Sequence, residues 1–313
     1  MKRRSVPSPR ASRSASACAC VALAAATLWI SGCGGQGEST SAPAREATDP
    51  VLRFCAIPDQ DETRLREKFG PVAAYLSDAL GVEVEYVHAT SYSDSVELFR
   101  NGDVDLAWFG GLSGVQARHF VPGARAIAQG KEDPEFYSYF IANVASGLEP
   151  SDAFPEGLAG RRFAFGEPGS TSGRLMPEWF IRTNAGVPPE ELFERVSFSG
   201  SHDRTAELVA AGQVDVGAIN YKVYDRRVAE GQTDPNVVRV IWRSPTYPDY
   251  NFTAHPRLEV RFRAGFTDRL QAALIAMRDP DLLSAFPREA LVPASNEDYA
   301  SIRELALALE FIR

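Results

Sequence analysis

Cysteine is scarce in this chain, with four residues among 313, and most of the four lie outside the region that can fold. Cys18 and Cys20 belong to an apolar N-terminal stretch and Cys33 follows it, so the remaining chain holds only Cys55. This excludes an intramolecular disulfide and a cysteine-based metal site in that part of the chain. The four histidines show no metal-ligand spacing either, and we expect no metal and no other cofactor.

The chain also lacks a second long hydrophobic run and an excess of basic residues. Its N-terminal apolar run, 17–29, is too short to span a membrane, and no later stretch is long and apolar enough. The formal net charge is −8, which argues against nucleic-acid binding. We therefore expect neither a membrane-spanning protein nor a partner made of nucleic acid.

The N-terminus has the parts of an export signal. Five basic residues lie before or at the start of the apolar run, and Ile30-Ser31-Gly32-Cys33 follows it. This last segment resembles the bacterial lipobox, in which the cysteine becomes the lipidated first residue of the mature protein. We expect a lipoprotein signal peptide over residues 1–32, lipidation of Cys33 and a flexible tether over 33–50. The body would then lie in the periplasm or cell envelope, attached to a membrane through its lipid anchor only.

Strands and helices alternate in the predicted secondary structure of the remaining chain. Apolar spacing predicts strands at 51–57, 82–87, 104–108, 163–165 and 214–219 and helices at 64–80, 94–100, 175–184, 205–211, 267–277 and 297–311. This alternation indicates an α/β fold with mainly parallel sheets.

An internal echo indicates two similar lobes. Segments 96–107 and 206–217 both read as a helix, a glycine and a strand with Val-Asp, and they lie 110 residues apart. The proline-rich segment 244–250 is typical of extended chain that returns to the first lobe. We expect lobe I over 51–143 and 246–313, lobe II over 144–245, and a hinge of two crossing strands.

The turn 166–174, between a predicted strand and a predicted helix, is the most informative motif. A helix start offers unpaired backbone N–H groups and the positive end of the helix dipole. Ser170, Thr171 and Ser172 add hydroxyl donors without a positive charge. The turn therefore suits an oxyanion, with an ordinary N-cap as the alternative.

Several motifs in a consistent order carry a family resemblance. They are Ala-Ile-Pro-Asp at 56–59, Gly-Asp-Val-Asp-Leu-Ala-Trp-Phe-Gly at 102–110, Gly-Ser-Thr-Ser-Gly at 169–173, Ser-Gly-Ser-His-Asp at 199–203 and Val-Asp-Val-Gly-Ala-Ile at 214–219. Together they resemble the periplasmic binding proteins of phosphate, phosphite and phosphonate ABC transporters, over roughly residues 51–313. The Trp-Phe-Gly-Gly run at 108–111 is most similar to a branch described as selenate-binding.

The resemblance implies a type II-like two-lobed binding protein that performs no chemistry on its ligand. It implies a small oxyanion in the cleft between the lobes, an ABC permease and ATPase as partners, and a monomeric chain. The ligand-binding residues that it implies by position are Tyr92, Trp108, Phe109, Tyr137, Ser138, Ser170, Thr171, Ser172, His202, Asn220 and Tyr221.

Asn220 departs from the phosphonate branch, which places an acidic residue after this strand. A carboxylate repels an oxyanion unless the anion carries a proton, whereas an amide can donate to an unprotonated one. We infer a preference for an unprotonated dianion such as selenate or sulfate, with a structural role of Asn220 as the alternative. His202 would be either a charged donor, in which case binding weakens as the pH rises, or a neutral one.

Two other classes of protein are alternatives to the binding component of an importer. The same two-lobed body could present its ligand to a membrane receptor as a sensing lipoprotein, which the sequence does not separate from transport. A hydrolase is the remote alternative, because Thr171 and not a serine is at the centre of the Gly-x-x-x-Gly turn. His202 and Asp203 are adjacent, so they cannot form a relay with each other.

Overall fold

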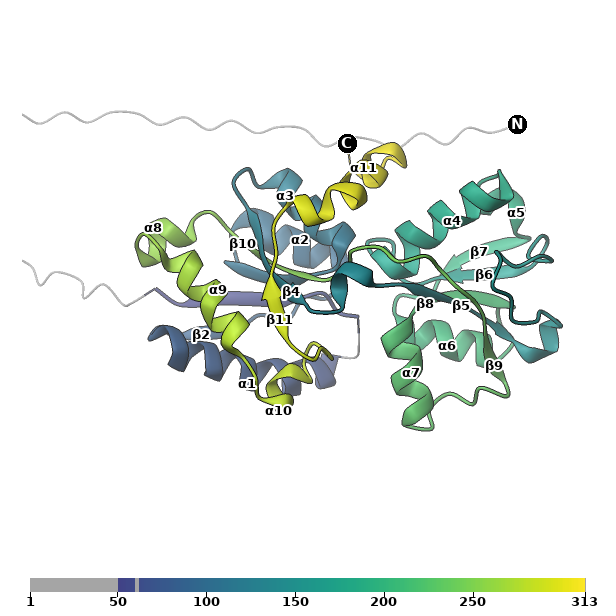
Figure 1. Ribbon diagram of the computed structural model, residues 1–313, viewed down its shortest axis with the longest axis horizontal. Helices are drawn as coiled ribbons and strands as arrows, with labels where there is room; N and C mark the ends of the chain where they lie inside the picture. The colour runs from purple at the N-terminus through teal and green to yellow at the C-terminus, as the bar shows by residue number, and fades with distance from the viewer. Residues whose placement is uncertain (1–49, 60–61, 313) are drawn as a thin grey trace, which may run out of the picture. The chain divides into compact units, whose positions relative to one another are not determined.

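The computed structural model describes residues 50–59 and 62–312, which form two α/β lobes, each built on one sheet (Figure 1). Cys33, the predicted signal peptide and nearly all of the predicted tether lie outside the described residues. The two-lobed α/β class is confirmed.

The first lobe is a six-stranded sheet with helices on both faces. Its strands, in the spatial order β11-β4-β10-β3-β1-β2, are β1 (Leu52–Ala56), β2 (Val84–Tyr86), β3 (Leu106–Phe109), β4 (Arg125–Gly130), β10 (Asn251–Ala254) and β11 (Leu291–Pro293). Its helices are α1 (Glu62–Leu80), α2 (Tyr92–Asn101), α3 (Gly111–Phe120), α8 (Leu258–Phe262), α9 (Phe266–Ala276), α10 (Pro280–Leu283) and α11 (Ala300–Ala308).

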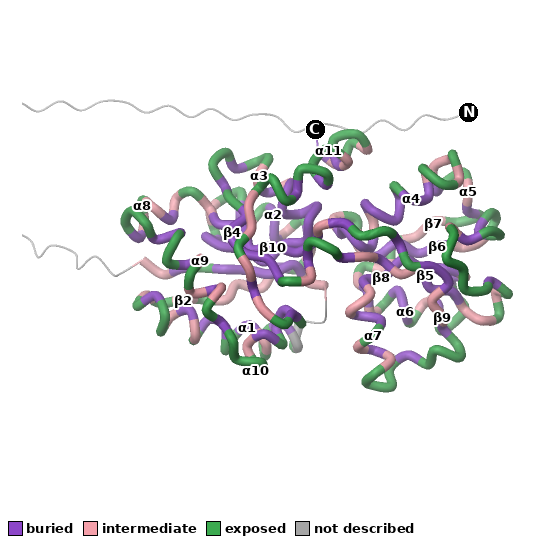
Figure 2. The backbone as a smooth tube through the Cα atoms, in the orientation of Figure 1, coloured by how far each residue is buried: buried purple, intermediate pink, exposed green. Residues whose placement is uncertain are grey.

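The second lobe is a five-stranded sheet of the same kind. Its strands, in the order β7-β6-β8-β5-β9, are β5 (Ser138–Asn143), β6 (Arg162–Phe165), β7 (Arg195–Phe198), β8 (Val216–Asn220) and β9 (Val238–Arg243). Its helices are α4 (Met176–Ala185), α5 (Pro189–Leu192), α6 (His202–Ala210) and α7 (Tyr221–Ala229). In both lobes the inner strands are mostly buried, the edge strands β2 and β7 are partly exposed, and the outer helix faces are exposed, as amphipathic helices on a sheet require (Figure 2).

The sheets are mixed and not mainly parallel, because of the strands that follow the two crossings between lobes. β5 pairs antiparallel with β8 and β9, and β10 pairs antiparallel with β3 and β4. The two crossing segments meet at an antiparallel bridge between Phe136 and Tyr247. The first crossing therefore precedes β5, and residues 138–143, which we expected in lobe I, pair within the second sheet.

The internal echo corresponds to a repeated structural unit. α2 ends at Gly102 (φ 77°) before β3, and the chain after α6 turns at Gly212 (φ 64°) before β8; glycine adopts these left-handed angles without strain. In both units the shared aspartate accepts a hydrogen bond from the backbone N–H of an arginine in the neighbouring strand: Arg53 N to Asp105 Oδ2 at 3.0 Å and Arg162 N to Asp215 Oδ2 at 2.9 Å. The repeat aligns the start of α2 with the start of α6.

Candidate ligand-binding cleft

Tyr92 and His202 occupy equivalent positions in the repeat, as the first residues of α2 and α6. Each follows a serine N-cap, since Ser91 accepts from Asp94 N and Ser201 accepts from Arg204 N. Both side chains are buried. The same local signal, a serine before a helix, thus contributes one polar side chain from each lobe.

The turn 166–174 is packed between these two side chains. A Cβ added to Gly169 would lie 2.9 Å from Cβ of Tyr92, and one added to Gly173 would lie 3.0 Å from Cε1 of His202. Only glycine permits both approaches. Ser170 caps the helical turn Thr171–Leu175 by accepting from Gly173 N at 3.0 Å, and its side chain is hydrogen-bonded to Tyr92.

His202, beside the turn 166–174, has a ring N–H group that donates no hydrogen bond within the described part of the chain. Its Nδ1 accepts from the backbone N–H of Asn220 at 3.3 Å, which puts the imidazole proton on Nε2. Nε2 is buried and has no hydrogen-bond partner in the described part of the chain. Burial lowers the pKa of His202 to about 4, against a smaller opposing effect of Asp203. The hydrogen bonding and burial of His202 therefore favour the neutral alternative.

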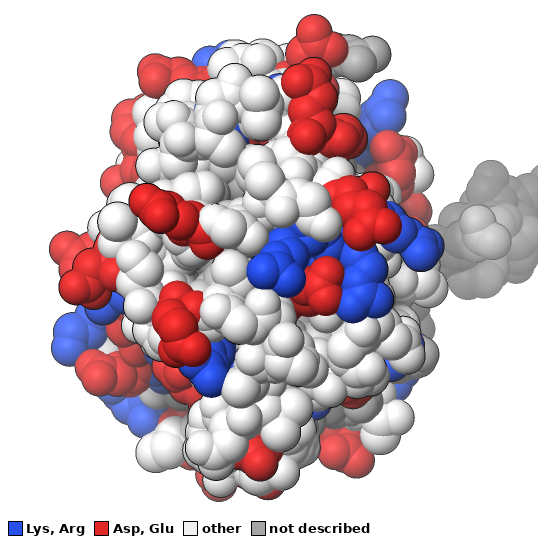
Figure 3. All heavy atoms as spheres, turned by 90° about the vertical axis from the view of Figure 1, so that its right-hand side faces the viewer, with Lys and Arg blue, Asp and Glu red and all other residues white. Residues whose placement is uncertain are grey.

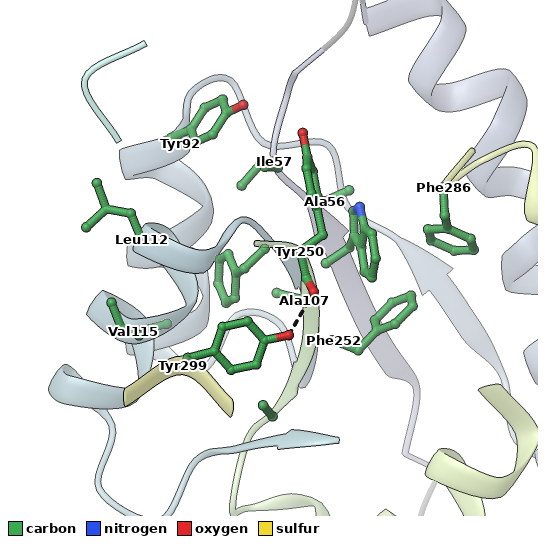
Figure 4. Packing of buried hydrophobic residues seen from close by; sticks show 14 of the residues in the cluster. Ala56, Ile57, Tyr92, Ala107, Leu112, Val115, Tyr250, Phe252, Phe286 and Tyr299 are labelled. Carbon is green, nitrogen blue, oxygen red and sulfur yellow. Dashed lines mark hydrogen bonds between the residues drawn. The ribbon is translucent and has the colours of Figure 1, made fainter. Parts of the chain in front are cut away.

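A hydrogen-bonded chain joins the two lobes next to His202. Asn220 Nδ2 donates to Tyr250 Oη at 2.9 Å, and Tyr250 Oη donates to Asp59 Oδ2 at 3.0 Å. Tyr250 stacks on Trp108 with ring centroids 5.5 Å apart. Figure 4 shows the hydroxyl groups of Tyr92 and Tyr250 pointing to the same end of the first sheet, near Ile57 after β1.

Thr171 makes a second contact between the lobes. Its Oγ1 accepts from Leu112 N at 3.0 Å, in the first turn of α3, and its hydroxyl is also hydrogen-bonded to Asp249. Asp249 Oδ1 accepts from Gly111 N at 2.8 Å. The hydroxyl of Thr171 is thus used on lobe I, which leaves its backbone N–H as the group available to an anion.

The remaining predicted residues differ in their surroundings. Ser138 donates to the Ser172 carbonyl at 2.7 Å and is hydrogen-bonded to Tyr247, so it supports the turn from behind. Trp108 borders the cleft beside Tyr250, whereas Phe109 is fully buried against Phe99.

Among the described residues, no hydrogen bond or aromatic ring contact joins Tyr137 or Tyr221 to the turn. They stack on each other with centroids 3.9 Å apart, next to the hinge residue Phe136. Their contact with a ligand stays a prediction, as does that of the other residues named from the sequence.

Three carboxyl groups near Tyr92 have raised pKa values. Burial raises the pKa of Asp59, of Glu167 and of Asp249, the last to about 7. Arg288 is buried above the ring of Tyr250, 4.7 Å from its centroid, and forms an ion pair with Asp133. The cleft therefore holds proton-accepting groups as well as donors.

Sequence reasoning did not assign four of these residues, namely Asp59, Asp249, Tyr250 and Arg288. Asp59 ended a quoted motif, and Asp249 and Tyr250 lay in the proline-rich return segment 244–250, so a signal existed for three of them. No local pattern marks Arg288, because its place depends on the packing of the C-terminal part against the hinge.

The chain has two lobes with buried cores, joined by two hinge segments, and polar side chains from both lobes converge at the turn 166–174. This arrangement defines a periplasmic-type substrate-binding protein. The comparisons narrow this class. The family model for the ABC transporter phosphonate periplasmic substrate-binding protein matches residues 54–299, and the chain belongs to this family.

Curated relatives and solved structures agree with this assignment. A probable ABC transporter phosphite binding protein, PhnD1 of Prochlorococcus marinus, is 37% identical over 271 residues, which are 84% of this chain and 91% of the relative. The phosphate-import protein PhnD of Mycolicibacterium smegmatis is 29% identical over 74% of each chain. The crystal structure of Prochlorococcus marinus PhnD1 with methylphosphonate has a TM-score of 0.79 at 38% identity and covers 84% of this chain and 99% of its own.

The recognition of the phosphate, phosphite and phosphonate family is thereby confirmed, and members of this family are transport binding components. The narrower resemblance to a selenate-binding branch stays a prediction.

The described residues contain neither a membrane-spanning helix nor a cluster of metal ligands. Among residues 50–59 and 62–312, no helix is long and apolar enough to cross a membrane. In the same residues no group of His, Cys, Asp or Glu side chains is arranged to hold a metal ion.

On the outer face of the second lobe, acidic side chains are scattered and basic ones form a small group (Figure 3).

Proposed function

We propose that this protein is the binding component of an ABC importer and takes a small phosphonate or phosphite anion into the cleft between its lobes. The observation that carries the proposal is the Nε2–H of His202, a buried donor without an acceptor in the described chain. An unpaired buried donor costs free energy, so it calls for an acceptor that arrives with the ligand.

The surroundings of His202 favour an anionic acceptor. The helical turn after Ser170 starts beside it, and first-turn N–H groups with the positive end of a helix dipole stabilise an oxyanion. Tyr92 Oη approaches the same turn from the other lobe through its hydrogen bond to Ser170. The relatives named for phosphite and phosphate, and the relative solved with methylphosphonate, support a phosphorus oxyanion as the ligand.

We propose binding without chemistry. His202 Nδ1 takes a backbone N–H and not a carboxylate, while Asp203 is paired with Arg226 and Arg227. A serine hydrolase needs the carboxylate on the histidine that activates its nucleophile. This arrangement supports a solute-binding role for the Ser-His-Asp turn.

The full proposal includes the cellular setting. The protein would be lipid-anchored through Cys33 outside the cytoplasm, act as a monomer and deliver its ligand to a permease and ATPase. Metabolic labelling with a lipid precursor, compared between the wild type and Cys33→Ser, tests the anchor, which is expected to be absent from the variant.

A thermal-shift panel tests the ligand class. The purified protein is heated with phosphite, methylphosphonate, phosphate, sulfate and selenate in turn. A ligand of the native state alone stabilises by about 2.7 kcal/mol at a concentration of 100 Kd. We expect the largest shifts from phosphite and methylphosphonate, and a panel in which only sulfate or selenate stabilises would contradict the proposal.

A further inference from the structure

Arg174, at the end of the turn 166–174, carries a buried positive charge. Its guanidinium lies over two aromatic rings of its own lobe, 4.2 Å from the ring centre of Phe165 and 5.1 Å from that of Phe198. Its Nη2 forms an ion pair with Glu178 Oε2 at 2.5 Å. Only 14% of the side chain is exposed, and Nη1 is buried without a hydrogen-bond partner among the described residues. The faces of aromatic rings therefore stabilise the part of this cation that no oxygen accepts.

A third ring beside this cation comes from the first lobe. Phe311, in the segment after α11, has its ring centre 5.5 Å from the Arg174 guanidinium. The carbonyl of Phe311 accepts from Gln116 Nε2 of α3 at 3.1 Å, and the first turn of the same helix binds Thr171. The helical turn 171–175 is thus joined to lobe I near both of its ends, by a hydrogen bond at Thr171 and by a cation–π contact at Arg174.

The backbone after α11 holds Phe311 in this place through a strained residue. The helix ends in a Schellman motif, in which Phe311 N donates to Ala306 O at 2.8 Å and Glu310 N donates to Leu307 O at 3.1 Å. The motif needs a left-handed residue, which is usually glycine, but here it is Glu310 with a φ of 60°. The next residue after Phe311, Ile312, is buried in the hydrophobic core. The segment is therefore fixed on lobe I, with the ring of Phe311 presented to the second lobe.

The contact between Arg174 and Phe311 is separate from the other contacts of the two lobes. Further along, α4 of the second lobe and α11 of the first lobe face each other across an apolar groove of about 480 Å³. The groove is lined by Trp179 of α4, by Leu305 of α11 and by the hinge residues 245–248. Because the two helices do not fill the space between them there, a change at Arg174 or Phe311 removes one discrete contact.

Loss of water around Arg174 strengthens its attraction to the ring of Phe311. Burial lowers the pKa of the Arg174 guanidinium, and the neighbouring Glu178 opposes this. A cation over a ring face gains more when water is excluded from both partners. When the lobes separate, Phe311 leaves with lobe I and water reaches this side of Arg174. The contact therefore favours the conformations in which the two lobes are in contact.

We propose that Arg174 and Phe311 form a latch that slows the release of the ligand from the turn 166–174. Arg174 is a positioning residue in this proposal, because it acts through the turn whose N–H groups face the anion. This rests on the proposed function and adds the contact that controls how long the anion stays bound. A latch made only after the ligand has entered raises the dissociation rate when it is removed and leaves the association rate nearly unchanged.

Calorimetry and stopped-flow fluorescence with methylphosphonate test the latch in Arg174→Met, in Phe311→Leu and in the double variant. Methionine keeps an apolar stem without the charge, and leucine keeps the apolar bulk without the ring face. We expect each single variant to raise the Kd and the dissociation rate by roughly 5- to 30-fold, with the association rate within about threefold of the wild type. The double variant should be no weaker than the weaker single variant, because both remove the same contact.

Arg182→Met is the matched control. Arg182 Nε donates to the other oxygen of Glu178, Oε1, at 2.8 Å from within the second lobe. The control disturbs the same carboxylate as Arg174→Met and should leave the Kd and the dissociation rate unchanged. Phe311→Leu removes no charge, so it covers the case in which Arg174→Met does not fold. A wild-type dissociation rate in Phe311→Leu, an equal effect of Arg182→Met, or additive effects in the double variant would overturn the latch.

Small-angle X-ray scattering of the ligand-free proteins separates the latch from the proposed function. If the wild type binds neither phosphite nor methylphosphonate, the proposed function fails, and the scattering then decides the latch alone. A larger radius of gyration in Phe311→Leu than in the wild type and Arg182→Met supports it, because the lobes then separate more readily. Equal radii of gyration in all three proteins would overturn it.

Discussion

Replacing Thr171 by valine should weaken ligand binding without weakening the fold. Thr171 is 2% exposed, and its hydroxyl accepts from Leu112 N across the lobe boundary and contacts Asp249, which is 1% exposed. Valine has nearly the same shape, so no cavity results. The change leaves the Leu112 N–H of α3 without its acceptor and takes one donor from Asp249.

Thr171 makes this contact across the lobe boundary, so we expect the cost to fall on conformations in which the two lobes are in contact. When the lobes part, water can reach the groups that Thr171 had satisfied. A buried group left without a partner costs about 1–3 kcal/mol. Because closure and binding are coupled, this penalty appears as an affinity loss of about 5- to 150-fold.

Calorimetry with methylphosphonate measures the affinity, and thermal unfolding of the ligand-free protein measures the fold. Thr171→Ser keeps the hydroxyl and should bind within about threefold of the wild type, a difference well below 1.4 kcal/mol. A Thr171→Val variant with wild-type affinity would refute the role of this contact in closure. So would an affinity loss that merely follows an equal loss of unfolding midpoint.

Three further predictions follow from His202 and from the buried ion pair at the hinge. His202→Ala should weaken methylphosphonate binding about 10- to 100-fold in calorimetry, as expected for one hydrogen bond to a charged group, whereas the exposed His119→Ala should not change it. Because the folded-state pKa of His202, about 4, is below its unfolded value of 6.5, the unfolded chain binds more protons between these values. The free energy of unfolding should therefore fall as the pH drops from about 6.5 to 4, by about 3 kcal/mol relative to His202→Gln in urea titrations, and equal pH profiles would contradict this. Arg288→Met should lower the free energy of unfolding by about 3–5 kcal/mol, because it leaves the fully buried Asp133 unpaired, and a change below 1 kcal/mol would show that the pair does not stabilise the hinge.

The lobes could be predicted because their signals are local. The alternation along 51–108 and 163–219 follows from apolar spacing, and the echo at a distance of 110 residues correctly indicated a repeated unit. The strand directions could not be read in the same way. β5 and β10 enter their sheets after the crossings, and their antiparallel pairing depends on where the other lobe begins.

The residues of the site also divide into those with a local sequence signal and those whose position depends on the tertiary fold. The serine N-caps before Tyr92 and His202 and the Ser170 turn carry local signals, and the structure places all three groups together. Asp59, 191 residues from Tyr250, is joined to it by a hydrogen bond across the fold. No spacing rule connects two such residues, so the sequence did not predict a carboxyl group joined to Asn220 through Tyr250.

The most direct measurement is a crystal structure of this protein with methylphosphonate. The account predicts the phosphonate group in the cleft, with one oxygen about 2.7–3.2 Å from His202 Nε2 and others at the turn after Ser170 and at Tyr92 Oη. A ligand bound elsewhere, or bound in the cleft with His202 Nε2 still unpaired, would contradict it.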